Sequence, residues 1–91
     1  MQEIRRAVVR IANKKGLHAR ASAKIVEAAA RFQSRIRISK DGQTVDARSI
    51  MGLMMLAASE GSEIAIEAEG VDATVALAAI VALAEAKFGE E

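Results

Sequence analysis

Strand-like and helix-like patterns of apolar residues follow one another along the chain in an order that few folds can accommodate. Alternation of apolar and polar residues is typical of strands, and it predicts four of them, at Glu3–Ile11, 35–38, Gln43–Asp46 and Glu63–Glu69. Apolar residues spaced three to four apart are typical of helices, and they predict three, at 19–32, from Ser49 onward, and from 70–72 to about Phe88. No linker, repeat or low-complexity tract interrupts this order.

The length of 91 residues, 52% of them apolar, is enough for one modest core and too little for two, so we expect one domain over residues 1–91. The chain has no cysteine and a single histidine, which argues against disulfides, thiolate chemistry and a transition-metal site, and we expect no cofactor. The N-terminus lacks an apolar signal-peptide core, and the longest apolar run, 75–84, is too short to span a bilayer. We therefore expect a cytoplasmic protein without membrane insertion.

The single histidine, His18, lies in the stretch Asn13–Ser22, where a glycine turn meets the first predicted helix. The start of a helix leaves backbone N–H groups unpaired and carries the positive end of the helix dipole, so it favours an anion. A neutral imidazole keeps one free lone pair and can act as a nucleophile, which here would give a phosphohistidine. Its phosphoryl group could bind the backbone N–H groups of Ala19 and Arg20 and the Arg20 side chain. Further positive potential would come from Lys14, Lys15 and Lys24.

The run Gly16-Leu17-His18-Ala19-Arg20, preceded by Asn13, resembles the active-site signature of HPr, the histidine-containing phosphocarrier family of the bacterial phosphotransferase system. The resemblance implies that His18 is phosphorylated on Nδ1 and that Arg20 stabilises the phosphate. The usual family pattern has proline after the arginine, whereas this chain has Ala21, which we expect to loosen the first helical turn without removing a reacting group. The form Asn-Lys-x-Gly-Leu-His is more similar to the nitrogen-related branch than to the sugar-transport branch.

A second stretch, Arg48-Ser49-Ile50-Met51-x-Leu53, resembles the second signature of the same family. Serine is a favoured N-cap, so the simplest interpretation of Ser49 is a helix cap. In some bacteria a dedicated HPr kinase phosphorylates this serine, and the resemblance makes Ser49 a candidate for regulatory phosphorylation. A phosphate there would bring about −1.5 to −2 charges beside the neighbouring surface and weaken docking of the upstream donor.

The helix after Ser49 is expected to direct Leu53 and Leu56 into the core and to leave its other apolar side chains partly exposed. Exposed methionines suit a surface that must pack against several unlike partners. The alternative, that these side chains are ordinary core, stays open, because Gly52 weakens the helix and blurs its period. We expect the partner-binding surface to consist of Ala19, Arg20, Ala23, Lys24, Ile50, Met51, Met54 and Met55.

The HPr resemblance covers essentially the whole chain and implies an α+β fold. This fold is a two-layer open-faced sandwich, with a four-stranded antiparallel sheet in the order 1-4-2-3 covered on one face by three helices. The resemblance also implies a phosphocarrier rather than an enzyme: His18 would take its phosphoryl group from phospho-Enzyme I and pass it to a histidine of an Enzyme IIA protein, in sugar uptake or nitrogen-related regulation. The implied partners are Enzyme I, Enzyme IIA and, where a cell has it, HPr kinase/phosphorylase, and we expect a monomer.

The charges are unevenly distributed: residues 1–48 carry twelve of the thirteen basic residues and four acids, while 49–91 carry one basic residue and eight acids. The implied strand order explains this asymmetry, because the acidic fourth strand would lie between the two basic strands. Opposite charges would then alternate across the open face of the sheet, between Glu63, Glu67 and Glu69 on one strand and Arg6, Arg10, Arg35 and Arg37 on its neighbours. A sheet with strands one and two adjacent would contradict this explanation.

Two other functional classes are open at this point. The chain could be a regulatory protein that uses the methionine surface and Ser49 while His18 only caps a helix, or a basic nucleic-acid-binding module. Against the second, the chain has no tyrosine or tryptophan, two phenylalanines and no Gly-x-x-Gly clamp, so we expect no nucleic-acid partner. Substitution of His18 tests the first alternative, and the salt dependence of binding to DNA or RNA tests the second.

Overall fold

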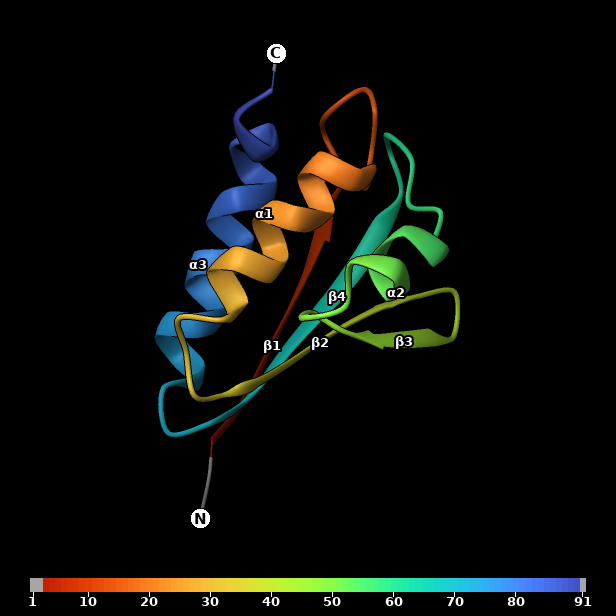
Figure 1. Ribbon diagram of the computed structural model, residues 1–91. Helices are drawn as coiled ribbons and strands as arrows, with labels where there is room; N and C mark the ends of the chain where they lie inside the picture. Colours follow the sequence, from red (N-terminus) through yellow and green to blue (C-terminus); the bar gives the residue numbers. More distant parts are fainter. Residues whose placement is uncertain (1–2, 91) are drawn as a thin grey trace.

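The four strands form one antiparallel sheet in the order β1-β4-β2-β3 in the computed structural model, which describes residues 3–90 (Figure 1). The strands are β1 (Glu3–Arg10), β2 (Arg35–Lys40), β3 (Gln43–Asp46) and β4 (Glu63–Gly70). The helices are α1 (Ala19–Ala29), α2 (Ile50–Met55) and α3 (Ala73–Glu85), followed by a 3-10 turn, η1 (Lys87–Gly89). The predicted order of elements and the predicted order of strands are both confirmed.

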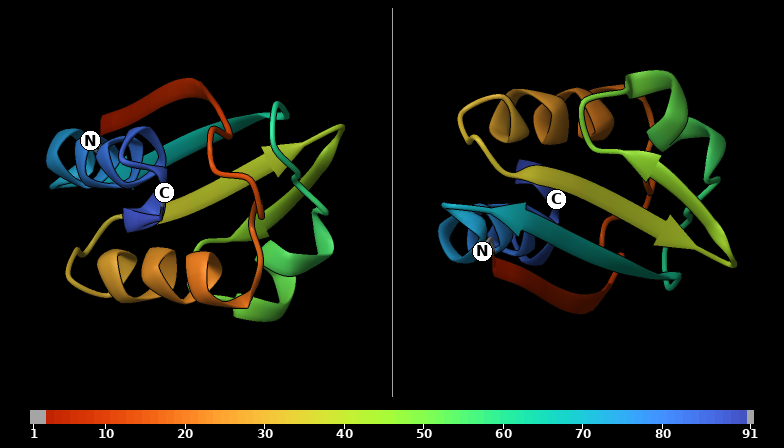
Figure 2. Two further views of the ribbon diagram at one scale, coloured as in Figure 1. Left: turned by 90° about the horizontal axis from the view of Figure 1, so that it is seen from above. Right: turned by 90° about the horizontal axis from the view of Figure 1, so that it is seen from below.

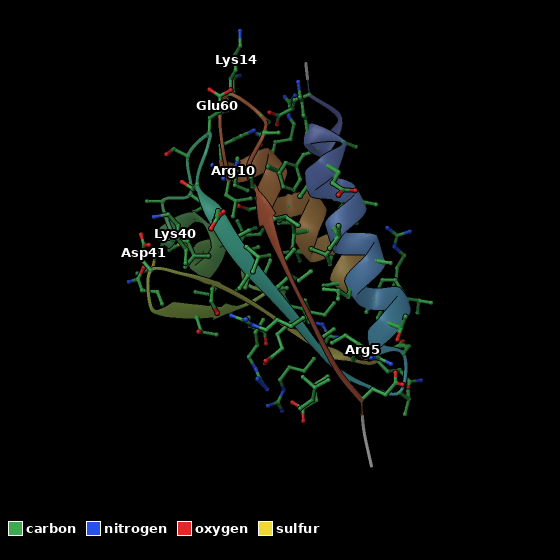
Figure 3. The ribbon with its side chains drawn as sticks, turned by 180° about the vertical axis from the view of Figure 1, so that it is seen from behind. Arg5, Arg10, Lys14, Lys40, Asp41 and Glu60 are labelled. Carbon is green, nitrogen blue, oxygen red and sulfur yellow. The ribbon has the colours of Figure 1, made fainter. Side chains whose placement is uncertain are left out.

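The helices lie on one side of the sheet, and the other face is open (Figures 2 and 3). α3 packs on β1 and β4, while α2 packs on β3 and on α1. The strand residues that face the helices are buried together with one stripe from each helix, and this core includes Ile25, Ile36, Ile38, Leu53, Ile64, Ile66, Ile80 and Phe88. The predicted two-layer open-faced sandwich is therefore confirmed. Within residues 3–90, no helix is both long and apolar enough to cross a bilayer.

Opposite charges meet across the open face in the way that the sequence predicts. The strand register pairs Arg6 and Arg37 with Glu67, Arg10 with Glu63, and Arg35 with Glu69. Arg37 lies 3.1 Å from both Glu67 and Glu69, and Arg10 lies 3.3 Å from Glu63. The uneven charge along the sequence thus becomes a mixed surface on the open face of the folded protein.

The hairpin between β2 and β3 turns at Asp41 and Gly42, as predicted. Their φ angles are +51° and +83°, and positive φ at both central residues is the geometry of the type I′ turn that suits the twist of a hairpin. Beside the turn, the hydroxyl groups of Ser39 and Thr44 lie 2.9 Å apart across the two strands. Glycine meets the demand of this turn without strain.

Two helices end earlier than the sequence pattern predicts. α1 ends at Ala29 instead of Phe32, and α3 ends at Glu85 instead of about Phe88. After α3 the backbone enters the left-handed region, with φ of +57° at Lys87 and +55° at Phe88, and the Phe88 ring is buried. α3 leads the chain to the end of the molecule where the loop between β1 and α1 lies, so η1 and that loop are neighbours (Figure 1).

Candidate functional site

His18 is the N-cap of α1. Its backbone is extended, with φ −77° and ψ −177°, and the helix begins at the next residue even though alanine replaces the usual family proline at position 21. The ring nitrogen Nδ1 accepts a hydrogen bond from the backbone N–H of Arg20, at 3.3 Å. An accepting Nδ1 carries a lone pair, so the proton of a neutral imidazole lies on Nε2. The predicted acceptor nitrogen is therefore the one that faces the start of the helix.

The loop that carries His18 is held in place by the segment after α2. Leu17 is buried, and its backbone N–H donates to the carbonyl of Ala58 at 2.9 Å. Gly16 has a φ of +65°, and a Cβ at this position would collide with the same carbonyl. Only glycine lets the loop approach this backbone so closely, which explains why a glycine stands two residues before the histidine.

A carboxylate from the other end of the chain contacts the second ring nitrogen. Glu90 Oε2 lies 2.5 Å from His18 Nε2, and Glu90 Oε1 accepts a hydrogen bond from Asn13 Nδ2 at 2.9 Å. The hydrogen bond from Asn13, followed by that from His18, lowers the pKa of Glu90 below its ordinary value. Both oxygens of a charged carboxylate are therefore committed to the site.

Basic side chains surround the histidine on its solvent side. Lys14, Lys15 and Arg20 line a hollow of about 400 Å³ together with His18, Gly89 and Glu90. Within residues 3–90 the Arg20 guanidinium forms no ion pair, whereas Lys24 Nζ donates to the Phe88 carbonyl at 2.5 Å. In that same part of the chain, no three His, Cys, Asp or Glu side chains gather as metal ligands. The hollow suits a small anion such as a phosphoryl group.

Ser49 is the N-cap of α2, which confirms the simplest interpretation of this residue. Its side-chain oxygen accepts a hydrogen bond from the backbone N–H of Gly52 at 2.9 Å. The residue is half-buried, and its hydroxyl lies on a helix of one and a half turns rather than in either hollow beside His18.

The apolar residues of α2 and its C-cap divide as predicted: Leu53 and the C-cap Leu56 are buried, while the other four are exposed. The exposed fractions are 40% for Ile50, 74% for Met51, 43% for Met54 and 70% for Met55, so these side chains are not ordinary core. Met54 also lines a second hollow, of about 320 Å³, with Lys15, Leu17 and His18. The exposed apolar surface is therefore continuous with the histidine.

The predicted α1 part of the docking surface lies beside that patch, because α1 and α2 pack against each other (Figure 2). Ala19, Arg20 and Ala23 are exposed. Lys24 is half-buried, and its ammonium group is bound to the Phe88 carbonyl. Three of these four α1 residues are thus free to meet a partner.

The sequence patterns did not identify two residues of the site, Asn13 and Glu90. Asn13 is completely buried and bridges the Gly16 carbonyl and Glu90, with 2.9 Å for each hydrogen bond. Its place at the start of the signature is a signal that could have identified it. Glu90 lies 72 residues after His18 and belongs to no motif, so nothing in the sequence pattern connects them.

Comparison with known proteins places this arrangement in a recognised class. The family model described as "PTS HPr component phosphorylation site" matches residues 5–86. A phosphocarrier protein HPr of Cupriavidus necator is 51% identical over 80 residues, which are 88% of this chain and 90% of the relative.

Solved structures give the same result. An HPr crystal structure from Thermoanaerobacter tengcongensis has a TM-score of 0.91 and 46% identity, covering 96% of this chain and 98% of that one. A structure described as an HPr dimer from the same organism has a TM-score of 0.76 and 48% identity, covering 90% and 94%.

These matches define a phosphocarrier protein of the phosphotransferase system and not a catalytic enzyme. The chain belongs to the HPr family.

Proposed function

We propose that His18 accepts a phosphoryl group from phospho-Enzyme I on Nδ1 and passes it to a histidine of an Enzyme IIA protein. The observation that carries this proposal is the state of the imidazole: Nδ1 accepts the Arg20 N–H at 3.3 Å and so keeps its lone pair at the start of a helix. Whether the output is sugar uptake or nitrogen-related regulation depends on which Enzyme IIA accepts the group.

The surroundings of His18 supply what phosphoryl transfer needs, which is positioning and stabilisation of charge. The backbone N–H of Arg20 already points at Nδ1, where the phosphorus would be attached. The N–H of Ala19 at the first helical position adds a donor for the phosphate oxygens. The guanidinium of Arg20, which forms no ion pair within residues 3–90, adds further donors, while Lys14 and Lys15 add positive potential. The phosphohistidine is an intermediate of transfer between partners, so the chain itself needs no acid–base pair.

The partners would dock on one surface in turn. We assign this surface to Ala19, Arg20 and Ala23 of α1 and to the exposed apolar residues of α2, with Lys24 at its edge. Methionine side chains adapt to unlike partners, and a carrier needs transient contacts that release quickly. The hollow shared by Met54 and His18 brings the acceptor nitrogen and the apolar patch into one footprint.

Phosphorylation of Ser49 by an HPr kinase/phosphorylase would act on this footprint. Ser49 caps the helix that carries the exposed methionines. About two negative charges at that cap would suit the helix dipole but would lie beside the docking surface, so we expect weaker binding of Enzyme I.

We further propose that residues 1–91 act as one domain, as a monomer in the cytoplasm, without nucleic acid, metal or cofactor. The burial of side chains from every helix in a single core supports one folding unit. The relative described as an HPr dimer makes the oligomeric state a necessary measurement, which sedimentation equilibrium of the purified chain provides.

The decisive experiment is the intact mass of the protein after incubation with Enzyme I and phosphoenolpyruvate. We expect one added phosphoryl group that is lost in acid and is absent from His18→Ala, while Ser49→Ala gains the same mass as the native chain. A folded native protein that gains no mass, with an Enzyme I competent for its branch, would contradict the proposal and favour the purely regulatory alternative.

A further inference from the structure

The two nitrogens of the His18 ring are held from opposite sides. On one side, Nδ1 accepts the Arg20 backbone N–H at 3.3 Å. On the other side, Nε2 lies 2.5 Å from Glu90 Oε2. Because an accepting Nδ1 cannot carry the proton, the ring proton lies on Nε2 and is donated to Glu90.

We propose that Glu90 is a positioning residue that keeps a proton on His18 Nε2 both before and after phosphorylation. This inference rests on the proposed function of His18 as the phosphoryl acceptor. It assigns to Glu90 two effects: it selects the ring tautomer whose Nδ1 is free to react, and it balances the charge of the phosphorylated ring.

The transfer steps show why this proton matters. On arrival, the Nδ1 lone pair forms the new N–P bond, the N–P bond of the donor breaks, and its electron pair stays on the donor nitrogen. With Nε2–H retained, the phosphorylated ring is a cation, which the carboxylate of Glu90 balances. On departure the N–P bond breaks, its electron pair returns to Nδ1, and the ring leaves as neutral imidazole. Without the Nε2 proton the ring would have to leave as the more basic imidazolate anion, which slows transfer.

The structure holds the Glu90 carboxylate firmly enough for this role. Asn13, which is completely buried, donates to Glu90 Oε1 at 2.9 Å. The preceding residues are anchored by the buried Phe88 ring and by the bond from Lys24 Nζ to the Phe88 carbonyl. The lowered pKa of Glu90, caused first by the Asn13 hydrogen bond and then by that of His18, keeps the carboxylate charged at neutral pH.

The other charged side chains that line the two hollows beside the ring, within residues 3–90, are basic. Lys14 and Lys15 of the preceding loop and Arg20 of α1 line the hollow on its solvent side. Toward α2 the lining residues after Leu17 are uncharged, namely Met54, Ala57, Ala58 and Ser59. Among the described residues, 3–90, that line these two hollows, Glu90 is the one carboxylate, so its removal leaves the Nε2 side of the phosphorylated ring without a carboxylate from this set.

The first test needs no phosphoryl donor. Since His18 is the only histidine in the chain, the ring ¹⁵N signals in a long-range ¹H–¹⁵N spectrum belong to one residue. We expect a single tautomer, protonated on Nε2, in the native chain and in the control Glu85→Gln, whose side chain is exposed on α3. In Glu90→Ala, among the contacts of the ring within residues 3–90, only the 3.3 Å bond from the Arg20 N–H still favours the Nε2–H form, so we expect the ring ¹⁵N signals to shift toward the average of the two tautomers. Unchanged ring signals in Glu90→Ala, or a native ring protonated on Nδ1, would overturn the inference.

The second test follows loss of the phosphoryl group after chemical phosphorylation with phosphoramidate. At pH 5 we expect equal rates of loss, while at pH 8 Glu90→Ala loses the group about tenfold more slowly than the native chain because its ring gives up the proton. Glu90→Gln, with the same size and no charge, is expected to behave like Glu90→Ala, and Glu85→Gln like the native chain. Identical pH profiles would refute the role of Glu90.

The two tests also separate this inference from the function on which it rests. If the native chain takes no phosphoryl group from Enzyme I but Glu90→Ala changes the ring tautomer, the proposed function fails and the tautomer assignment stands. If Enzyme I phosphorylates His18 but both tests give native behaviour in Glu90→Ala, the function stands and the role of Glu90 fails.

Discussion

Two helix starts in this protein use the same local device with different surroundings. The N-cap of α1 is His18, whose Nδ1 accepts the N–H of Arg20 at 3.3 Å, and the N-cap of α2 is Ser49, whose Oγ accepts the N–H of Gly52 at 2.9 Å. The serine cap is the shorter hydrogen bond and has an ordinary capping role. The histidine cap is longer, and its ring is also held by a carboxylate and faces a hollow lined with basic residues.

This difference shows that a helix N-terminus becomes a reactive site when the fold places reactive and charged side chains beside it. The N–H groups and the dipole are common to both helices. Within residues 3–90, it is at His18 that a side chain able to act as a nucleophile, a guanidinium without an ion pair and a distant carboxylate meet. The exposed side chains that follow Ser49 in α2 are apolar, which suits contact with a partner rather than chemistry.

Among variants that keep His18, the largest effect should come from removing the guanidinium of Arg20. We expect Arg20→Ala to slow phosphoryl transfer from Enzyme I by about 100-fold, because a donor to the transferring phosphoryl group is lost. Arg48 lies beside the Ser49 cap in the sequence, just as Arg20 lies close to His18. The guanidinium of Arg48 donates to the Phe32 carbonyl at 2.8 Å. Arg48→Ala is therefore the matched control. Equal rates in the two variants, measured by rapid quench, would break the distinction between the two helix starts.

A second prediction concerns the loop that places His18. Gly16 and Gly42 both have positive φ, but a Cβ would meet the Ala58 carbonyl only at Gly16, since nothing lies within 4 Å of a Cβ at Gly42. We expect Gly42→Ala to lower the free energy of unfolding by about 1 kcal/mol through backbone strain alone. Gly16→Ala adds a steric clash and should cost about 3 kcal/mol.

Urea unfolding of both glycine variants measures this difference. Equal losses of stability would mean that the close approach of the His18 loop to Ala58 is not maintained in solution.

The serine cap should matter for stability and not for the chemistry of His18. We expect Ser49→Ala to lower the free energy of unfolding by about 1 kcal/mol, the usual effect of losing an N-cap. Ser49→Asp keeps a capping oxygen and should recover most of that loss. Phosphoryl acceptance by Ser49→Ala should equal that of the native chain, and a large decrease would show that the two helix starts are coupled.

Most of the fold could be predicted from the sequence because its signals are local or pairwise. The alternation in β4 and the helical spacing around Ile25 each reflect one buried face. The resemblance to the HPr family implied the strand order, the charge asymmetry agreed with β4 between the two basic strands, and the register confirms it. The predicted ends of α1 and α3 were wrong, because the apolar spacing in the sequence continues beyond the residue at which each helix ends.

The site could be predicted only in part, for a related reason. His18 and Arg20 lie in one motif, and Ser49 lies in another, so a pattern along the chain identifies them. The bond between His18 and Glu90 depends on left-handed backbone at Lys87 and Phe88, which neither residue type favours. Tertiary packing of the Phe88 ring stabilises that conformation, and packing of this kind leaves no periodic signal.

The smallest predicted effect is a difference in how the free energy of unfolding depends on pH, and it distinguishes the His18 cap from the Ser49 cap. The pKa of Glu90 is lower in the folded protein than its unfolded value of about 4.3, so Glu90 contributes stability above that pH. This contribution is lost as the pH falls through the folded pKa. The Ser49 cap has no ionisable partner, since its bond is to the Gly52 N–H. Between pH 5 and pH 2, Ser49→Ala should therefore lose stability in parallel with the native chain.

Glu90→Gln should instead lose less stability than the native chain over the same pH range. Its curve should not become flat, because the hydrogen bond from the Ser34 hydroxyl, followed by that from the Gln33 N–H, also lowers the pKa of Asp72. Asp72→Asn in the Glu90→Gln background should remove that second contribution. Thermal unfolding at a series of pH values measures all four chains. A slope for Glu90→Gln equal to the native slope would mean that the carboxylate is not held against His18 and Asn13 in solution, and the His18 cap would then be as simple as the serine cap.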